Sequence, residues 1–150
     1  LKRYETNCKS KISNKTRNRK KKMTITPRDE QMAALIEKDR GGPINMLNLL
    51  KFKEFAEYAD GSDAEISGQE AYMRYGAKVA VLVKKLGGEM LFGSGANALV
   101  IGDGELQWDM VAIMKYPSVT AFVDMFNSKE YDDIHLHRDA GLAHQLLVQC

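Results

Sequence analysis

Apolar positions along the chain follow two patterns, which predict strands and helices in a definite order. Strands are predicted at residues 44–52, 89–101, 108–116 and 145–150. The longest helix is predicted over residues 67–86, because apolar side chains there recur mostly at three- and four-residue spacing. Ser67 and Glu70 form a capping box at its start, and two glycines follow its last residue.

Three further helical segments are expected outside this stretch. Thr26-Pro27 begins the first, since it supplies an N-cap hydroxyl and a proline suited to the first helical position. Pro117-Ser118 begins a short helix, and Ser128 begins a helical stretch that continues to about Leu142. The acidic, glycine-containing segment 54–66 is expected to be a loop.

The order of these elements is β-α-β-β-α-β with an extra leading helix. This order predicts a ferredoxin-like α+β fold, in which a four-stranded antiparallel sheet carries its helices on one face. We expect this domain over residues 44–150. A helical extension is expected at 23–43, and a basic, disordered tail at 1–22.

Both faces of the predicted sheet are apolar. In the first strand Ile44 and Met46 share one face while Leu47 and Leu49 lie on the other, and the strand at 108–116 repeats this arrangement. The helices of one chain cover a single face, so the other face is expected to pack against a second copy, as a homodimer. The alternative is a monomer in which the loop and the leading helix fold across that face. The pattern alone does not say which face meets the helices.

Charge is divided unevenly along the 150 residues, although the net charge is only +2. The first 22 residues hold ten Lys/Arg and one acid. This segment could bind nucleic acid or act as a nuclear address. The simpler interpretation is a solvated run of charge upstream of a fresh start at Met23, outside the native protein. The remainder holds nineteen acids and twelve Lys/Arg, and this acidic balance implies no nucleic-acid partner.

A cytoplasmic protein without a membrane anchor is expected. The longest unbroken apolar run is Val79–Val83, and no apolar stretch follows the basic N-terminus as it would in a signal peptide. Cys8 and Cys150 lie near the two ends and have no neighbours in metal-ligand spacing. A disulfide framework and a zinc cluster are therefore both disfavoured.

Several short motifs resemble one known family in their order and spacing. They are Met46–Phe52, Gly68–Gly76, Gly87-Gly88, Tyr116–Ser118, Ser128–Tyr131 and His137-Arg138. Over residues 43–150 they resemble the domain of unknown function 1330 family. The resemblance implies a dimeric α/β barrel, in which two ferredoxin-like units join sheet to sheet. The wider superfamily includes cofactor-free monooxygenases, lactone isomerases and haem-dependent chlorite-degrading enzymes, but their catalytic motifs do not map onto this chain.

Arg138 is the centre of the candidate site. If the segment after Ser128 is helical, Arg138 shares a stripe with apolar residues that face the core. A guanidinium placed there requires an anion or several carbonyl acceptors. Asp109 and Asp124 are candidate ion-pair partners, which would make the arginine structural. The alternative is an anionic ligand, such as a carboxylate or an enolate, held by Arg138.

Other polar and aromatic residues are candidates for the wall of the same site. The candidate ligand contacts are Asn48, Tyr72, Tyr75, Trp108, Tyr131 and His135. Each also has a simpler interpretation, a satisfied buried amide for Asn48 and packing within the core for the aromatic rings. His137 and His135 are candidate proton shuttles, because histidine titrates near neutral pH. His135, His137 and His144 lack the usual spacing of metal ligands, and no glycine-rich segment fits a phosphate or dinucleotide loop, so no metal or cofactor is expected.

Two hypotheses of function therefore stay open. In the first, a small organic ligand binds between the sheet and the helices, and the protein is a cofactor-free enzyme of the monooxygenase or isomerase type. In the second, the protein is a non-catalytic dimeric module with a packed interior, which binds a metabolite or a partner or serves assembly. An interior cavity of a few hundred Å³ would favour the first hypothesis.

Overall fold

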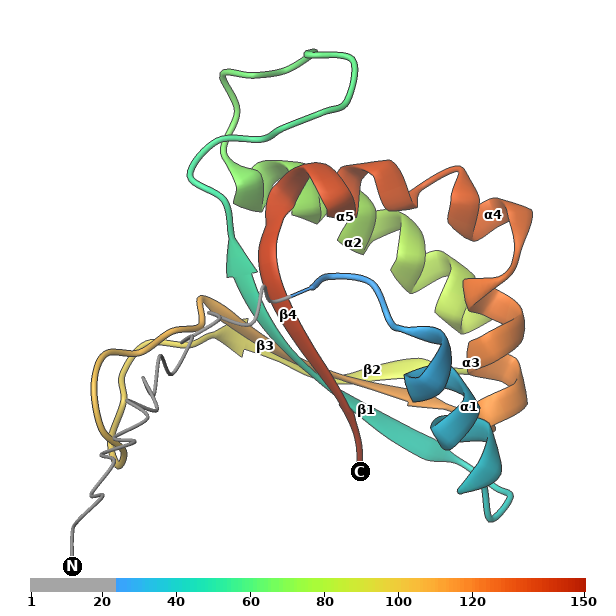
Figure 1. The fold of residues 1–150 in the computed structure, drawn as a ribbon. Coiled ribbons are helices and arrows are strands. Elements are labelled where there is room, and N and C mark those ends of the chain that lie inside the picture. The colour runs from blue at the N-terminus through green and yellow to red at the C-terminus, as the bar shows by residue number, and fades with distance from the viewer. Residues whose placement is uncertain (1–23) are drawn as a thin grey trace, which may run out of the picture.

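The computed structural model describes residues 24–150 and contains one antiparallel sheet with helices on one of its faces (Figure 1). The strands are β1 (Ile44–Phe52), β2 (Glu89–Gly95), β3 (Met110–Tyr116) and β4 (Leu142–Gln149), in the sheet order β2-β3-β1-β4. The helices are α1 (Asp29–Glu37), α2 (Gly68–Lys85), α3 (Val119–Phe126), α4 (Lys129–Asp132) and α5 (His135–Gly141). This is the predicted ferredoxin-like α+β fold with a leading helix. The predicted tail at 1–22 lies outside the described residues.

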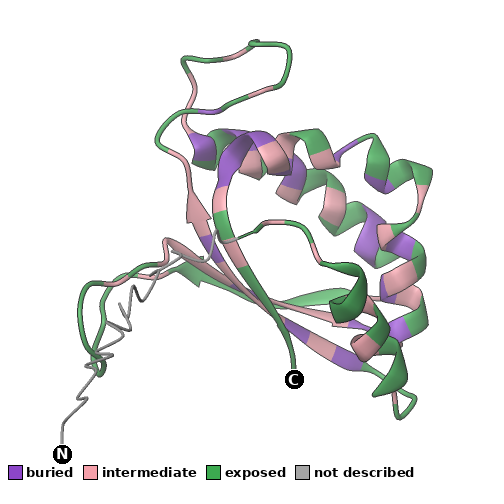
Figure 2. Cartoon of the chain, in the orientation of Figure 1, coloured by how far each residue is buried: buried purple, intermediate pink, exposed green. Residues whose placement is uncertain are grey.

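The main core lies between the helices and one face of the sheet. Ile44 and Met46 of β1 belong to this core and Leu50 shares their face, and all three are almost completely buried. Figure 2 shows buried positions, in purple, on the helices and on the sheet beneath them. Tyr116 of β3 pairs with Ile44 and lies on the same face, because paired residues of antiparallel strands point the same way. The structure thus shows which of the two apolar faces meets the helices.

The second face of the sheet is apolar and carries no helix. Leu47 and Leu49 of β1 lie on it, opposite Ile113 and Val111 of β3. Two side chains of β4 continue the face at its edge, Leu146 and Val148, which are 43% and 45% exposed. We call this surface, together with Phe92 of β2, the open face.

Neither segment that could have covered the open face does so. The side chains of Met32 and Leu35 in α1 pack against the main core on the helix side. In the loop before α2, the buried Ala56 packs with Ala71 of α2 and Ala140 of α5. The expectation that this loop and the leading helix might fold across the open face is therefore wrong.

The connection between β2 and β3 is longer than the sequence predicts. β2 ends at Gly95 rather than at residue 101, because the next apolar residues are not paired in the sheet. Val100 and Ile101 are about nine-tenths exposed, at 89% and 92%. Trp108 lies in this connection and is half-buried, so the expectation that it begins a strand is also wrong.

The helical stretch after Ser128 is two short helices rather than one. α4 ends at Asp132 and α5 begins at His135, and β4 starts at Leu142 instead of residue 145. In the described part of the chain, no helix has the length and apolar character needed to cross a membrane.

Candidate functional site

Arg138 is the one charged residue among those described that is buried, with 7% of its surface exposed. It lies on α5, four residues before β4 begins. The apolar members of the predicted stripe, Tyr131, Ile134 and Leu142, are buried as well. The predicted orientation of this stripe toward the core is therefore confirmed, even though the helix breaks within it.

The guanidinium of Arg138 donates to three oxygen atoms of the chain itself. Nη2 donates to the backbone carbonyl of Ile25 and to Oε1 of Gln145, the latter at 2.5 Å. Nη1 donates to the carboxylate of Asp139 at 3.2 Å. The Asp139 side chain is 44% exposed, so water weakens this ion pair. Two of the three acceptors are neutral, and among residues 24–150 no buried acid balances the charge of Arg138.

Neither acid predicted as an ion-pair partner contacts Arg138. Asp109 accepts from Nζ of Lys51 and from the backbone N–H of Phe52, each at 2.8 Å. These bonds hold the segment before β3 against the end of β1. Asp124 is exposed on α3. The predicted partners are therefore wrong, and the physical reason is the strand register, which places Asp109 beside Lys51.

Gln145 connects Arg138 to the centre of the sheet. Its Oε1 accepts from Arg138, and its Nε2 donates to Oδ1 of Asn48 at 2.9 Å. Asn48 in turn donates from Nδ2 to the carbonyl oxygen of Met46 at 3.1 Å. Because a guanidinium only donates, it fixes the orientation of the Gln145 amide and, through it, that of Asn48. Three polar side chains thus form one continuous network from α5 to β1.

A short segment before α1 completes this network. We call residues 24–28, which lead into α1, the N-terminal strap (blue in Figure 1). The carbonyl oxygen of Ile25 in this strap accepts from Nη2 of Arg138. An oxygen of a bound carboxylate would use the same donor. The strap therefore occupies the position that a ligand of Arg138 would take.

Three of the predicted ligand contacts form a row of aromatic rings near Arg138. The ring centroids of Tyr72 and Tyr75 are 5.4 Å apart, and those of Tyr75 and Tyr131 are 6.1 Å apart. His135 continues the row, stacked on Tyr131 at 6.2 Å. Burial raises the pKa of the hydroxyls of Tyr72 and Tyr75, and the positive charge of Arg138 opposes this rise. Tyr72 and Tyr75 therefore lie within the electrostatic field of Arg138.

The raised pKa of Tyr72 predicts a loss of stability in alkaline solution. Burial raises this pKa from 10.0 to about 12, so the folded chain keeps the phenol proton to higher pH than the unfolded chain does. The contribution of protonated Tyr72 to the free energy of unfolding is fully present below about pH 10, and it is lost as the pH rises through about 12. Between these values we expect the free energy of unfolding of the parent to fall on the order of 2–3 kcal/mol more than that of Tyr72→Phe. Urea denaturation at a series of pH values measures both, and equal slopes would contradict the prediction.

Of the two candidate proton shuttles, His135 lies beside the guanidinium network, with Nε2 3.7 Å from the carboxylate of Asp139, whereas His137 lies apart from it. Nδ1 of His137 is 2.7 Å from Oη of Tyr58, and its Nε2 is 3.2 Å from Nζ of Lys78. His135 is half-buried, and its Nδ1 donates to the carbonyl oxygen of Asp132 at 2.8 Å. Successive helical residues point about 100° apart, so His137 and Arg138 face different sides of α5. Within residues 24–150, no three His, Cys, Asp or Glu side chains lie close enough together to hold a metal ion.

Two parts of the network around Arg138 were not predicted from the sequence. Gln145 interrupts the apolar run that forms β4, and it pairs with the core residue Leu50. A polar residue at a position paired with the core could have been recognised as a candidate site residue. Ile25 contributes only its backbone carbonyl, and no sequence pattern predicts which donor a backbone carbonyl will meet.

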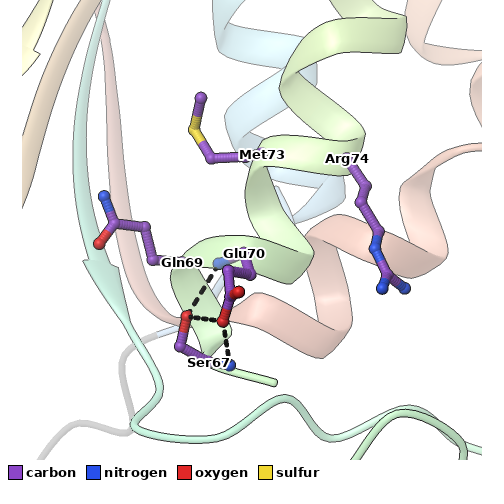
Figure 3. Close-up of a pocket in the computed structure, with 5 residues that line it drawn as sticks. All are labelled: Ser67, Gln69, Glu70, Met73 and Arg74. Atoms are coloured by element: carbon purple, nitrogen blue, oxygen red, sulfur yellow. Dashed lines mark hydrogen bonds between the residues drawn. The ribbon is translucent and has the colours of Figure 1, made fainter.

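An open hollow of about 460 Å³, which Arg138 does not line, lies beside the start of α2 (Figure 3). Its lining residues are Ser67, Gln69, Glu70, Met73 and Arg74. The Oγ of Ser67 accepts from the backbone N–H of Glu70, and the Glu70 carboxylate accepts from the Ser67 N–H at 2.8 Å. This is the predicted capping box, which lowers the pKa of Glu70. Since capping already uses the polar atoms of Ser67 and Glu70, these two residues are weak candidates for ligand contacts.

Comparison with known proteins places the chain in a family. The family model described as "Domain of unknown function (DUF1330)" matches residues 61–149. A crystal structure of methylated RPA0582 protein is 35% identical in sequence, with a TM-score of 0.79 over 86% of this chain and 94% of that one. A structure of the RPA0582 protein of unknown function from Rhodopseudomonas palustris is 34% identical, with a TM-score of 0.77 over 85% and 95% of the two chains. No curated protein matches the sequence significantly. The chain belongs to the domain of unknown function 1330 family.

Proposed function

We propose that this protein is a homodimer, joined through the open faces of its two sheets, and that each subunit binds a small organic anion at Arg138. The anion carries a carboxylate or enolate group. It binds between the sheet and the helices, in the place that the N-terminal strap takes at Arg138. This proposal concerns binding, and it assigns no reaction to the protein.

The observation that carries the ligand proposal is the set of acceptors around Arg138. Burying a charged side chain costs free energy unless a counter-charge or several hydrogen bonds compensate it. Here the deepest acceptors are a carbonyl of the strap and an amide oxygen of Gln145, and the acid Asp139 lies toward solvent. A carboxylate in place of the Ile25 carbonyl would add a negative charge on the side of the guanidinium where both acceptors are now neutral. The guanidinium fork suits a carboxylate, since it can donate two parallel N–H bonds.

The strap determines how a ligand would enter. With the strap in place, the Ile25 carbonyl uses the donor that the ligand needs. Binding therefore requires residues 24–28 to move away from α5. The strap lies outside the β-α-β-β-α-β unit, so its displacement leaves the strands and helices of that unit paired as they are. We expect the ligand and the strap to compete for Arg138.

The remaining walls of the proposed site combine polar and aromatic groups. Asn48 and Gln145 present amide groups, and Tyr72 presents a phenol whose raised pKa keeps it protonated, so it is a donor at neutral pH. A ligand with a carboxylate and a nearby carbonyl or ring would match this combination. The non-catalytic module with a packed interior is the alternative. It is supported by the internal acceptors that Arg138 already has.

The test of the ligand proposal is a comparison of two arginine variants in solution. We expect small carboxylates, with acetate, malonate and benzoate as probes, to raise the melting temperature of the parent chain. A probe at one hundred times its Kd would stabilise the protein by about 2.7 kcal/mol. In Arg138→Lys we expect the affinity, measured by isothermal titration calorimetry, to fall at least tenfold, because lysine cannot form the bidentate pair.

Arg40→Lys is the matched control, since Arg40 is exposed and lies on the segment between α1 and β1. This variant should bind the probes as the parent does. If no carboxylate binds the parent, or if the two variants bind equally well, Arg138 is a structural residue and the packed module is the better description.

A further inference from the structure

A second cluster of polar side chains lies on a different side of α5 from the guanidinium network. Three segments contribute to it. The loop between β1 and α2 supplies Tyr58 and Asp63, α2 supplies Arg74 and Lys78, and α5 supplies His137. Hydrogen bonds link all five side chains, and none of the five lies in the guanidinium network or on the open face.

The loop that carries Tyr58 is fixed to the helices. The buried Ala56 donates its backbone N–H to the carbonyl of Ile66 at 2.9 Å, and the next residue, Glu57, donates to the carbonyl of Ala140 at 3.0 Å. Asp63 adopts a left-handed backbone conformation, with φ at 50°, which an aspartate tolerates better than most residues. The backbone therefore holds the cluster in place on the surface.

The geometry fixes the proton positions in this cluster. The ammonium of Lys78 has only donors, so Nε2 of His137 must accept from it at 3.2 Å. The neutral ring then carries its proton on Nδ1, which donates to Oη of Tyr58 at 2.7 Å. Nη1 of Arg74 also donates to Oη of Tyr58, at 3.5 Å. The lone pairs of Tyr58 therefore face donors, and its own O–H is free to donate outward.

The cluster holds more donors than acceptors. Arg74 and Lys78 lie one turn apart on α2, an arrangement of like charges that destabilises an isolated helix. The carboxylate of Asp63 balances one of them, through its contact with Arg74 at 2.5 Å. The N–H groups left on Lys78 and Arg74, and the Tyr58 hydroxyl, have only solvent as acceptor in the described part of the chain. Glu70, one turn before Arg74, adds a second negative charge near Arg74, whereas Lys78 forms no ion pair in the described part of the chain.

We propose that Tyr58, Arg74 and Lys78 form a binding site for a phosphate group, either free phosphate or a phosphate monoester. A tetrahedral dianion offers acceptors to all three side chains at once and supplies a counter-charge for Lys78. His137 orients Tyr58 from behind, so that the hydroxyl points to the ligand. This site is separate from Arg138 and does not depend on the function proposed there.

Nuclear magnetic resonance of the full chain provides the test, with the imidazole of His137 as the probe. Burial, Lys78 and Arg74 together lower the pKa of His137, and Asp63 opposes them. A bound phosphate offsets the two cations, so we expect inorganic phosphate to raise this pKa by about half a unit or more. Sodium chloride at the same ionic strength should raise it far less. Phenyl phosphate, compared with inorganic phosphate, tells whether a monoester binds more tightly than the free ion.

Two lysine variants on the same helix make the test specific. Lys78→Gln should lower the phosphate affinity about tenfold, through the loss of a charge-assisted hydrogen bond. Lys84→Gln removes an equal charge from an exposed position of α2 and should leave the affinity unchanged. Arg138→Lys should bind phosphate as the parent does. The proposal is overturned if phosphate and chloride shift His137 equally, or if the two lysine variants have the same affinity.

Discussion

A Leu49→Asp variant is expected to be a monomer at concentrations where the parent chain is a dimer. Leu49 lies in the middle of the open face, between Val111 of β3 and Leu146 of β4. In the proposed dimer the new carboxylate would be buried without a partner, which costs about 3–5 kcal/mol. Two-fold symmetry places the change at both halves of the interface. We therefore expect the dimer dissociation constant to rise at least 1,000-fold, measured by analytical ultracentrifugation.

The control for this variant is Val81→Asp. Val81 is 70% exposed on the outer surface of α2, away from the sheet, and the substitution adds the same charge. It should leave the dimer intact. Circular dichroism should show that Leu49→Asp keeps its secondary structure, because position 49 of a monomer is only partly buried. A parent chain that is monomeric at micromolar concentration would contradict the proposal directly, as would a Leu49→Asp chain that still dimerises.

The order of strands and helices was predictable because local signals mark it. The capping box at Ser67 and Glu70 and the apolar stripe behind it identify α2, and both appear in the structure as predicted. Alternation in β1 identified two apolar faces, which helices of one chain could not both cover. These signals depend on near neighbours in the sequence, and the fold that they imply is the one observed.

The errors at element ends have a different origin. Residues 98–101 are apolar, yet they extend beyond the paired part of β2, and pairing rather than composition ends a strand. Similarly, α5 ends and β4 begins at Leu142, because that residue pairs with Phe52 of β1. In both places a contact between distant parts of the chain decides the boundary. A single sequence does not report such contacts.

The candidate site shows the same division. A charged residue within an apolar stripe pointed to Arg138, and its burial is confirmed. Its acceptors, however, come from α5 itself, from β4 and from a strap that precedes α1. His137 is next to Arg138 in sequence, but on the helix it faces Tyr58 and Lys78 instead. Sequence proximity grouped the two residues, and helical geometry separates them.

The largest loss of stability is expected from an alanine at Gly141, where α5 crosses the start of α2. A Cβ at this position would meet the carbonyl oxygen of Gly68 and would lie 2.8 Å from the backbone nitrogen of Tyr72. These atoms belong to the backbone, so a side-chain rotation cannot relieve the clash. Gly68 is equally confined, since its own Cβ would lie 2.6 Å from the carbonyl oxygen of Gly141. We expect Gly141→Ala to lower the free energy of unfolding by about 3 kcal/mol or more, measured by urea denaturation.

Gly76→Ala on the same α2 is the matched control. No atom outside its own helix lies within 4 Å of a Cβ at this position, and alanine favours the helix by roughly 0.5–1 kcal/mol over glycine. This variant should therefore be more stable than the parent. If both alanines had the same effect, backbone contact at the crossing would not be the cause.

Because α5 also carries Arg138, relief of the clash at Gly141 would move the guanidinium away from Gln145. A Gly141→Ala chain that remains folded should therefore also bind the carboxylate probes more weakly, whereas Gly76→Ala should bind them as the parent does.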